Sequence, residues 1–149
     1  MDFTINDIDI YTTYGAFLAE ERRGGRNNLN EILKASKVKE QTGVDIHENR
    51  GTEYPEVLNV QNLQRDFTLT FAITAATRAL WIEKYMLFIQ FLKSGQAGWL
   101  TMNFQTLGPL TIRCFYLNST DMSTLSYIWL EGQQAALFKV TFREPKPTI

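Results

Sequence analysis

The sequence is poor in the residues that build metal sites and disulfides, with one cysteine and one histidine in 149 residues. A single thiol, Cys114, cannot form an intramolecular disulfide, which fits a reducing compartment. The histidine, His47, lies in "VDIHEN" without a second imidazole or a thiol close by, so its spacing matches no standard zinc or calcium site. We therefore expect a solvated loop around His47 and neither a metal nor another cofactor.

Long hydrophobic runs are also missing. The longest apolar segment, 80–92, is interrupted by Glu83, Lys84 and Gln90. It is shorter than the roughly 20 residues that a membrane-spanning helix needs. The N-terminal "MDFTINDIDI" is acidic where a signal peptide carries positive charge. These features predict one soluble domain over residues 1–149, made in the cytoplasm and without a membrane partner.

An excess of charge of one sign is absent too, since 15 basic residues face 16 acidic ones. Specific nucleic-acid binding is therefore not expected. Gly24 and Gly25 stand among Arg22, Arg23 and Arg26, but no phosphate-binding loop motif surrounds them, so a flexible, turn-rich segment is predicted over 22–31. Cys114 falls on the apolar face of a predicted strand, and no serine lies in a nucleophile motif. Nothing in the pattern predicts an enzyme.

What the sequence does contain is a strand that leads directly into a helix. Apolar residues alternate from Phe67 to Ile73, and a helical pattern follows over about 77–93. Thr74 or Thr77 is suited to cap the helix start, and Gly95 stands where a C-cap glycine belongs. The apolar positions cover nearly the whole circumference, far more than the stripe of about 100° that one packed face requires. We expect one side to pack on the sheet and another side to contact a different subunit.

The remainder of the chain is mostly β in pattern. Alternating segments occur at 3–10, with a turn at Asn6 and Asp7, and at five further places: 15–20, 57–61, 99–104, 110–117 and 135–144, with an ambiguous segment at 123–132. The predicted fold is α+β but mainly β: an antiparallel β-sandwich or open barrel with one flanking helix. Between the early strands and the rest lies a polar segment, about 32–58, that has few core candidates. A long segment of this kind is more often a functional arm than an idle loop.

The three tryptophans leave a ligand-binding alternative open. Trp99 falls on the polar face of its predicted strand, opposite Leu100 and Met102. An aromatic side chain in that place could serve a carbohydrate or single-stranded nucleic-acid surface. A β-sandwich module that binds a ligand is therefore the alternative of another class, and packing in the core or between subunits is the simpler interpretation of the aromatics.

The order of these elements resembles a known family. The segments "FTINDIDIYTTYGAFL" and "RDFTLTFAI", the polar arm around "TGVDIHENRGTEYPEV", the helix and the closing "VTFREPKP" are similar to the N-terminal domain of phage distal tail proteins and, more broadly, to the tail-tube-like fold. Many distal tail proteins carry a second domain, and this sequence ends where that domain would begin. A distal-tail ring subunit and a tail tube subunit are thus both compatible with the pattern.

The resemblance implies a structural, non-enzymatic role in the virion tail of a phage or prophage. Copies would assemble head to tail into a ring, typically a hexamer, at the baseplate, and the ring would link tube and hub. Other tail proteins, including tube, hub and tape measure, would be its partners, and the chain would be made in the cytoplasm of the bacterial host. The helix and the arm supply the candidate interface residues Ile82, Met86, Ile89, Val44, Ile46, Arg50 and Tyr54.

Overall fold

The computed structural model describes residues 3–20, 24–45, 51–107, 110–120, 127–130 and 133–149. The strands are β1 (Phe3–Ile5), β2 (Ile8–Asp9), β3 (Ala16–Leu18), β4 (Val44–Asp45), β5 (Thr52–Glu53), β6 (Arg65–Ala75), β7 (Leu100–Phe104), β8 (Leu110–Thr120), β9 (Tyr127–Leu130) and β10 (Gln133–Glu144). The α-helices are α1 (Ile10–Tyr14), α2 (Asn27–Leu33) and α3 (Arg78–Ser94), with a 3-10 turn η1 over Gln105–Leu107.

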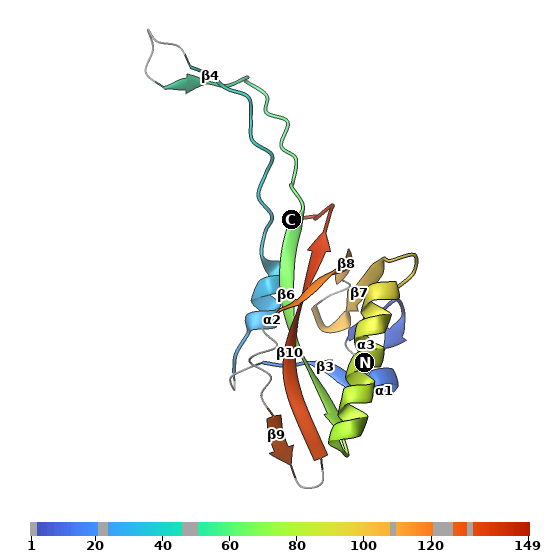
Figure 1. Ribbon diagram of the computed structural model, residues 1–149. Coiled ribbons are helices and arrows are strands. Elements are labelled where there is room, and N and C mark those ends of the chain that lie inside the picture. The colour runs from blue at the N-terminus through green and yellow to red at the C-terminus, as the bar shows by residue number, and fades with distance from the viewer. Residues whose placement is uncertain (1–2, 21–23, 46–50, 108–109, 121–126, 131–132) are drawn as a thin grey trace.

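One antiparallel sheet forms the body, in the order β2-β1-β7-β8-β10-β6-β3, with β9 paired to β10. The sheet curls into a half-barrel, and α3 lies along it (Figure 1). The strand β8 connects the two halves, since its first part pairs with β7 and its second part pairs with β10. The predicted class, mainly β with an open barrel and a flanking helix, is confirmed.

The core lies between the curled sheet and α3. Strand alternation sends every second side chain of β6 and β10 inward, so that Phe71 and Phe138 stack there and Phe88 of α3 meets both rings. Trp81 of α3 is also buried, and its ring Nε1 donates a hydrogen bond of 2.8 Å to the backbone oxygen of Ile73. The helix is thus fixed to the sheet by both packing and a polar contact.

The N-terminal hairpin forms as the sequence predicts. Asn6 and Asp7 make its turn with positive φ angles, 52° and 64°, which these residue types tolerate well. The Asn6 side chain also accepts a hydrogen bond of 2.8 Å from the backbone N–H of Thr101. This contact joins the hairpin to β7.

The predicted long helix is confirmed to within one residue at each end. The Thr77 hydroxyl accepts a hydrogen bond from the N–H of Leu80, as an N-cap should. Gly95 ends the helix with a φ of 46°, and a Cβ there would lie 2.4 Å from the backbone oxygen of Trp99. Only glycine fits this close approach between the helix end and the following turn.

The prediction of a flexible turn over 22–31 is wrong for its second half, where α2 forms. Intrinsic preference does not explain this helix, because Asn27 and Asn28 are poor helix formers. Glu20 supplies the missing stabilisation, since its carboxylate accepts hydrogen bonds of 2.9 and 3.0 Å from the N–H groups of Asn27 and Asn28. These long-range contacts override the local sequence signal.

The predicted arm exists, but it runs over 34–64 instead of 32–58. Ile32 belongs to α2 and is buried in the core. At the other end, the strand expected over 57–61 is wrong: this segment is exposed and lies in the returning leg of the arm. The arm projects well beyond the body as a long, narrow hairpin (Figure 1).

Candidate functional site

The arm is a two-legged projection with a defined base. Its legs pair near the body, where the N–H of Lys39 donates to the oxygen of Gln61 and the N–H of Leu63 donates to the oxygen of Lys37, both at 2.7 Å. The C-terminal segment braces the base, because the Asn62 side chain donates to the oxygen of Pro147 at 3.1 Å. The arm is therefore an ordered extension of the body and not an untethered loop.

A buried ion pair also holds the base. Arg65, at the start of β6, donates from its Nε to the Glu144 carboxylate at 2.7 Å, and both side chains are buried. The same guanidinium donates from Nη1 to the backbone oxygen of Lys34, where the outgoing leg begins. One side chain thus ties the first residue of the arm to the end of β10.

The two legs of the arm are unequal. Between the bridge of Val38 with Asn62 and the pairing of Val44 with Glu53, the outgoing leg has five residues (39–43) and the returning leg has eight (54–61). The three additional residues lengthen the returning leg, which bends at Glu56 and Val57, and we refer to its segment 54–58, "YPEVL", as the bulge. The bulge leaves Val57 85% exposed, the highest value among the exposed large hydrophobic side chains of the described residues.

Gly43 allows the legs to come close beside this bulge. A Cβ at this position would lie 2.5 Å from Cγ2 of Thr52 and 2.9 Å from the ring of Tyr54. A larger residue would force the side chains of Thr52 and Tyr54 to shift. Tyr54 and Val44, two of the predicted interface residues, are nevertheless 55% and 62% exposed. The other two arm predictions, Ile46 and Arg50, lie outside the described residues.

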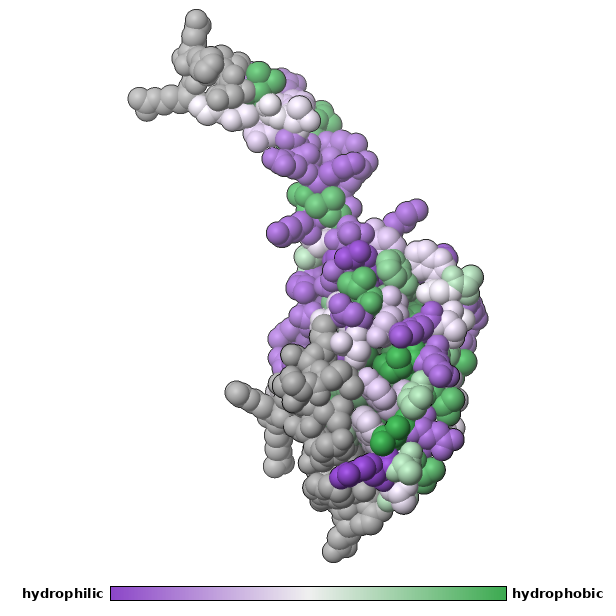
Figure 2. Space-filling view, in the orientation of Figure 1, coloured by the Kyte–Doolittle hydropathy of each residue, from purple (hydrophilic) through white to green (hydrophobic). Residues whose placement is uncertain are grey.

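The outer face of α3 is the second apolar surface. Ile82, Met86 and Leu87 are each about half exposed, whereas Ile89 is partly buried against the core. Of the three helix residues predicted at an interface, two therefore face outward and one supports the fold. Figure 2 shows hydrophobic side chains on the arm and on the flank of the body where α3 lies. The predicted residues thus divide between two separate surfaces.

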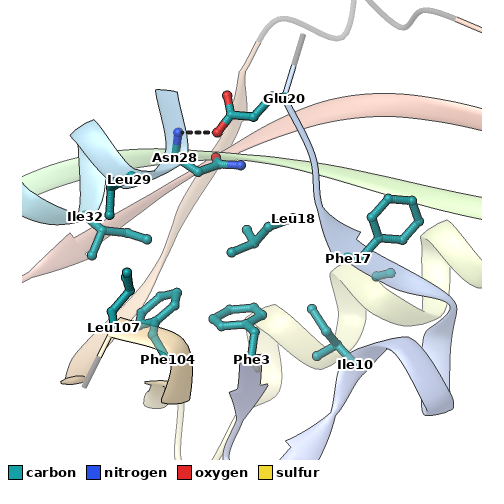
Figure 3. Close-up of a pocket in the computed structure, with 11 residues that line it drawn as sticks. Phe3, Ile10, Phe17, Leu18, Glu20, Asn28, Leu29, Ile32, Phe104 and Leu107 are labelled. Atoms are coloured by element: carbon teal, nitrogen blue, oxygen red, sulfur yellow. Dashed lines mark hydrogen bonds between the residues drawn. The ribbon is translucent and has the colours of Figure 1, made fainter. Parts of the chain in front are cut away.

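A third feature, an apolar pocket, was not expected from the sequence. It lies where the half-barrel stays open, between β1 and the end of β7 on one side and β3 and α2 on the other (Figure 3). Its volume is about 420 Å³. Its lining is Phe3, Ile10, Ala16, Phe17, Leu18, Glu20, Asn28, Leu29, Ile32, Phe104 and Leu107.

The polar side chains in this lining are already bonded. Glu20 caps α2, and the Asn28 amide donates to the oxygens of Ala19 and Thr70 at 2.7 and 3.2 Å. The Asn28 oxygen accepts from the N–H of Thr70 at 2.7 Å. Because Glu20 and Asn28 already have hydrogen-bond partners within the chain, the lining offers no unpaired polar side chain to a ligand. The pocket therefore favours an apolar occupant.

Trp99 stands in a cluster of aromatic and cationic side chains on another part of the surface. The Arg113 guanidinium lies over the indole ring at 4.5 Å, and the Phe115 ring meets it edge-on at 5.7 Å. Beside them Lys93 lies 5.5 Å from the centre of the Tyr116 ring. Trp99 is half-buried and borders a hollow of about 440 Å³. Such a group can receive a flat or anionic ligand.

Cys114 is buried among apolar neighbours, as its predicted strand face requires. Burial raises the pKa of the Cys114 thiol far above its usual range, with a smaller contribution from the Glu144 charge. A thiol in this environment stays protonated and behaves as a small apolar group.

Neither a metal centre nor a membrane helix is found in the part of the chain that the structure describes. No three His, Cys, Asp or Glu side chains gather there closely enough to hold a metal ion. No helix among these residues is long and apolar enough to cross a bilayer. His47, weighed above as a metal ligand, lies outside the described residues.

The sequence signal for these surfaces is uneven. The excess of apolar residues on α3 and the polar composition of the arm can be seen in the sequence and led to the predicted interface residues, whereas the pocket is assembled from six separate elements and has no local signature. No protein-family model matches the sequence, and a comparison with curated proteins finds no match.

Proposed function

We propose that this chain is a non-enzymatic structural subunit of a phage or prophage tail, and that its copies assemble into a ring. The ring would lie at the distal end of the tail and link the tube to the hub, with the tape measure protein as a further neighbour. The observation that carries the proposal is the arm, an ordered projection whose large apolar side chains are exposed. The second support for the proposal is the order of the elements, which resembles that of distal tail proteins.

Two different apolar surfaces support assembly into a ring. A head-to-tail contact joins one patch of a subunit to a different patch of the next, and it closes when the rotation between neighbours allows it. The arm and the outer face of α3 are two exposed apolar patches on one chain, and each would meet a different surface of a neighbouring copy. Burying a side chain such as Met86 or Val57 across a contact contributes about 1.5–3 kcal/mol.

The test is the mass of the purified protein over a wide concentration range, measured by native mass spectrometry and followed by electron microscopy of any large species. A closed ring, with six subunits as the expected number, supports the distal-tail function. Long stacks of rings would assign the chain to the tail tube instead. A monomer at every concentration, also in mixtures with candidate tube and hub proteins, contradicts the proposal.

A ligand-binding module is the second candidate function, and the Trp99 cluster favours it. An indole flanked by Arg113 and Phe115, next to a hollow, is an arrangement that binds sugars or nucleic-acid bases. The measurement is a fluorescence titration with neutral and acidic oligosaccharides and a short oligothymidine. A saturable change in the parent protein that disappears in Trp99→Phe favours this candidate.

A further inference from the structure

We propose that the apolar pocket at the open side of the half-barrel receives the bulge of the arm from a second copy of this chain. Val57 and Leu58 of the arriving arm would be the anchors. This inference rests on the proposed function, since it names the surface through which neighbouring subunits would meet.

The pocket is built for apolar side chains. Phe3, Leu18 and Ile32 come from three different elements and point into the same space in Figure 3. The two polar side chains of the lining bond within their own chain, as described above. A volume of about 420 Å³ is within the range of pockets that hold whole small ligands, so it has room for more than one aliphatic side chain.

The bulge offers the matching group. Val57 is 85% exposed and Leu58 is 44% exposed, next to one another on an ordered leg. A segment that is already held in place loses less conformational freedom on binding than a mobile loop does. The bulge therefore meets one requirement of an anchor, apolar surface without cover, and the paired residues on either side of it tie the returning leg to the outgoing leg.

The arm cannot serve its own pocket in this conformation. Its legs pair with each other, and the hairpin leads away from the body that contains the pocket (Figure 1). A second copy of the chain carries both surfaces of the contact: the arm that inserts and the pocket that receives an arm. Because the two surfaces differ, each subunit can give one arm and receive another, as a ring requires.

Charge supports the same pairing. Glu56 precedes the apolar anchors directly, and Arg26 precedes α2 directly, next to the Glu20 and Asn28 end of the pocket. Both side chains are exposed, and neither forms an ion pair within the described residues. Glu20, the acid in the pocket lining, is engaged by the N–H groups of α2, so Arg26 is the charge beside the pocket that can attract Glu56 and favour one orientation of the arm on its neighbour.

The first experiment measures association of Val57→Asp by light scattering, with Asn59→Asp on the same leg as the matched control. Loss of the apolar anchor is expected to weaken association roughly 10- to 100-fold, while the control stays close to the parent. A charge exchange then tests the orientation. Arg26→Glu is expected to weaken association, and combining it with Glu56→Arg is expected to restore it.

The second experiment is a cross-link between copies. Val57→Cys and Leu29→Cys are made in separate proteins, mixed and oxidised, with Asn30→Cys on the exposed side of α2 as the control. The native Cys114 is buried and does not compete. A disulfide between Val57→Cys and Leu29→Cys in high yield, and a much lower yield with Asn30→Cys, supports the contact.

The outcomes separate this inference from the ring itself. If a ring forms but Val57→Asp assembles normally and no selective cross-link appears, the ring stands and the arm–pocket contact is overturned. If the selective cross-link appears but only open pairs form, the contact stands and the ring is overturned. If there is neither assembly nor cross-link, both proposals fail.

Discussion

Two extended segments of the chain are treated in opposite ways. One is the first part of β6, Arg65–Thr70, which β3 does not cover because their pairing begins at Phe71, and the other is the returning leg of the arm. Along β6, the Asn28 side chain bonds both the N–H and the oxygen of Thr70, as a neighbouring strand would. Glu31 accepts from the N–H of Thr68 at 2.9 Å. On the arm, Val57 and Val60 extend into solvent without cover.

The difference shows where the molecule permits association. An open strand edge pairs with almost any other edge, and proteins usually block it. Here α2 blocks β6 with side chains, so backbone pairing at this edge is closed to other chains. The arm instead exposes side chains, which are recognised by shape and apolarity. Under the proposed function, contacts between subunits would therefore use the side chains of the arm and not backbone pairing at this edge of β6.

The largest expected effect comes from the residue that joins the two regions. Arg65→Met removes the partner of Glu144 and leaves a carboxylate buried without compensation. It also frees the base of the arm from the body. Breaking a buried pair in this way costs about 3–5 kcal/mol of unfolding free energy. Urea denaturation followed by tryptophan fluorescence measures the loss.

The double variant Arg65→Met with Glu144→Leu is the control for that experiment. It removes the uncompensated charge along with its partner, so a large part of the lost stability is expected to return. If the double variant is as unstable as the single one, the cost comes from the released arm base and not from the buried charge.

The next effect concerns the blocked edge. Asn28→Ala removes the side chain that bonds Thr70 and leaves the buried N–H of Thr70 without its partner, while the oxygen of Thr70 keeps its hydrogen bond from the N–H of Ala19. We expect a loss of about 2–3 kcal/mol in urea denaturation, accompanied by aggregation that rises with protein concentration. Asn30→Ala, an exposed position on the same helix, should change neither. Equal behaviour of the two variants would mean that Asn28 does not protect the edge.

The fold follows from the sequence where one local pattern decides it. The alternation in β6 and the caps at Thr77 and Gly95 predict a strand and a helix close to their observed ends, because each signal acts within a few residues. The helix α2 escapes prediction because its stabilising group, Glu20, lies outside it. The prediction of a strand over 57–61 fails for the opposite reason: its apolar residues alternate like those of a strand, but the returning leg is longer than the outgoing leg, and most of the segment has no strand partner.

The candidate site divides in the same way. An excess of apolar residues on one helix can be counted in the sequence, so Ile82 and Met86 are found. The pocket requires Phe3, Ile32 and Phe104 to meet across long separations in the chain, and no spacing rule connects them. An apolar residue of the arm or of α3 stays exposed only if the rest of the core packs without it. The sequence pattern alone does not show which residues these are.

The third prediction, with a smaller expected loss of stability, compares a core-facing residue of α3 with an exposed residue of the same helix. Ile89→Lys places a charge against the core and is expected to cost about 1–2 kcal/mol of unfolding free energy. Met86→Glu, on the exposed face, should change it by no more than about 0.5 kcal/mol. Under the proposed function Met86→Glu should still reduce assembly in light scattering. A folded Met86→Glu protein with unchanged assembly would remove the helix face from the interface.

The smallest effect belongs to the ion pair on the opposite side of the sheet from Arg65 and Glu144. Arg143 and Asp66 are the neighbouring cross-strand pair, bonded at 2.8 and 3.1 Å but well exposed to solvent. The hydrogen bond from Arg143, together with its charge, lowers the pKa of Asp66. The pair therefore stabilises the folded state at a pH above the usual carboxyl pKa of about 3.9, and this contribution disappears as the pH falls through the lowered folded value.

Comparing urea midpoints of the parent protein and Asp66→Asn from pH 7 down to pH 3 measures this contribution. The difference in urea midpoint between the two proteins should be small at pH 7, because water and salt screen an exposed ion pair. It should shrink further below about pH 4, as the carboxyl takes up its proton. Arg143→Gln should follow Asp66→Asn at pH 7, since either change removes the same pair. If the difference in urea midpoint stays constant from pH 7 to pH 3, Asp66 acts through packing and not through its charge. The exposed pair would then stabilise the fold by a different mechanism from the buried pair of Arg65 and Glu144, as well as more weakly.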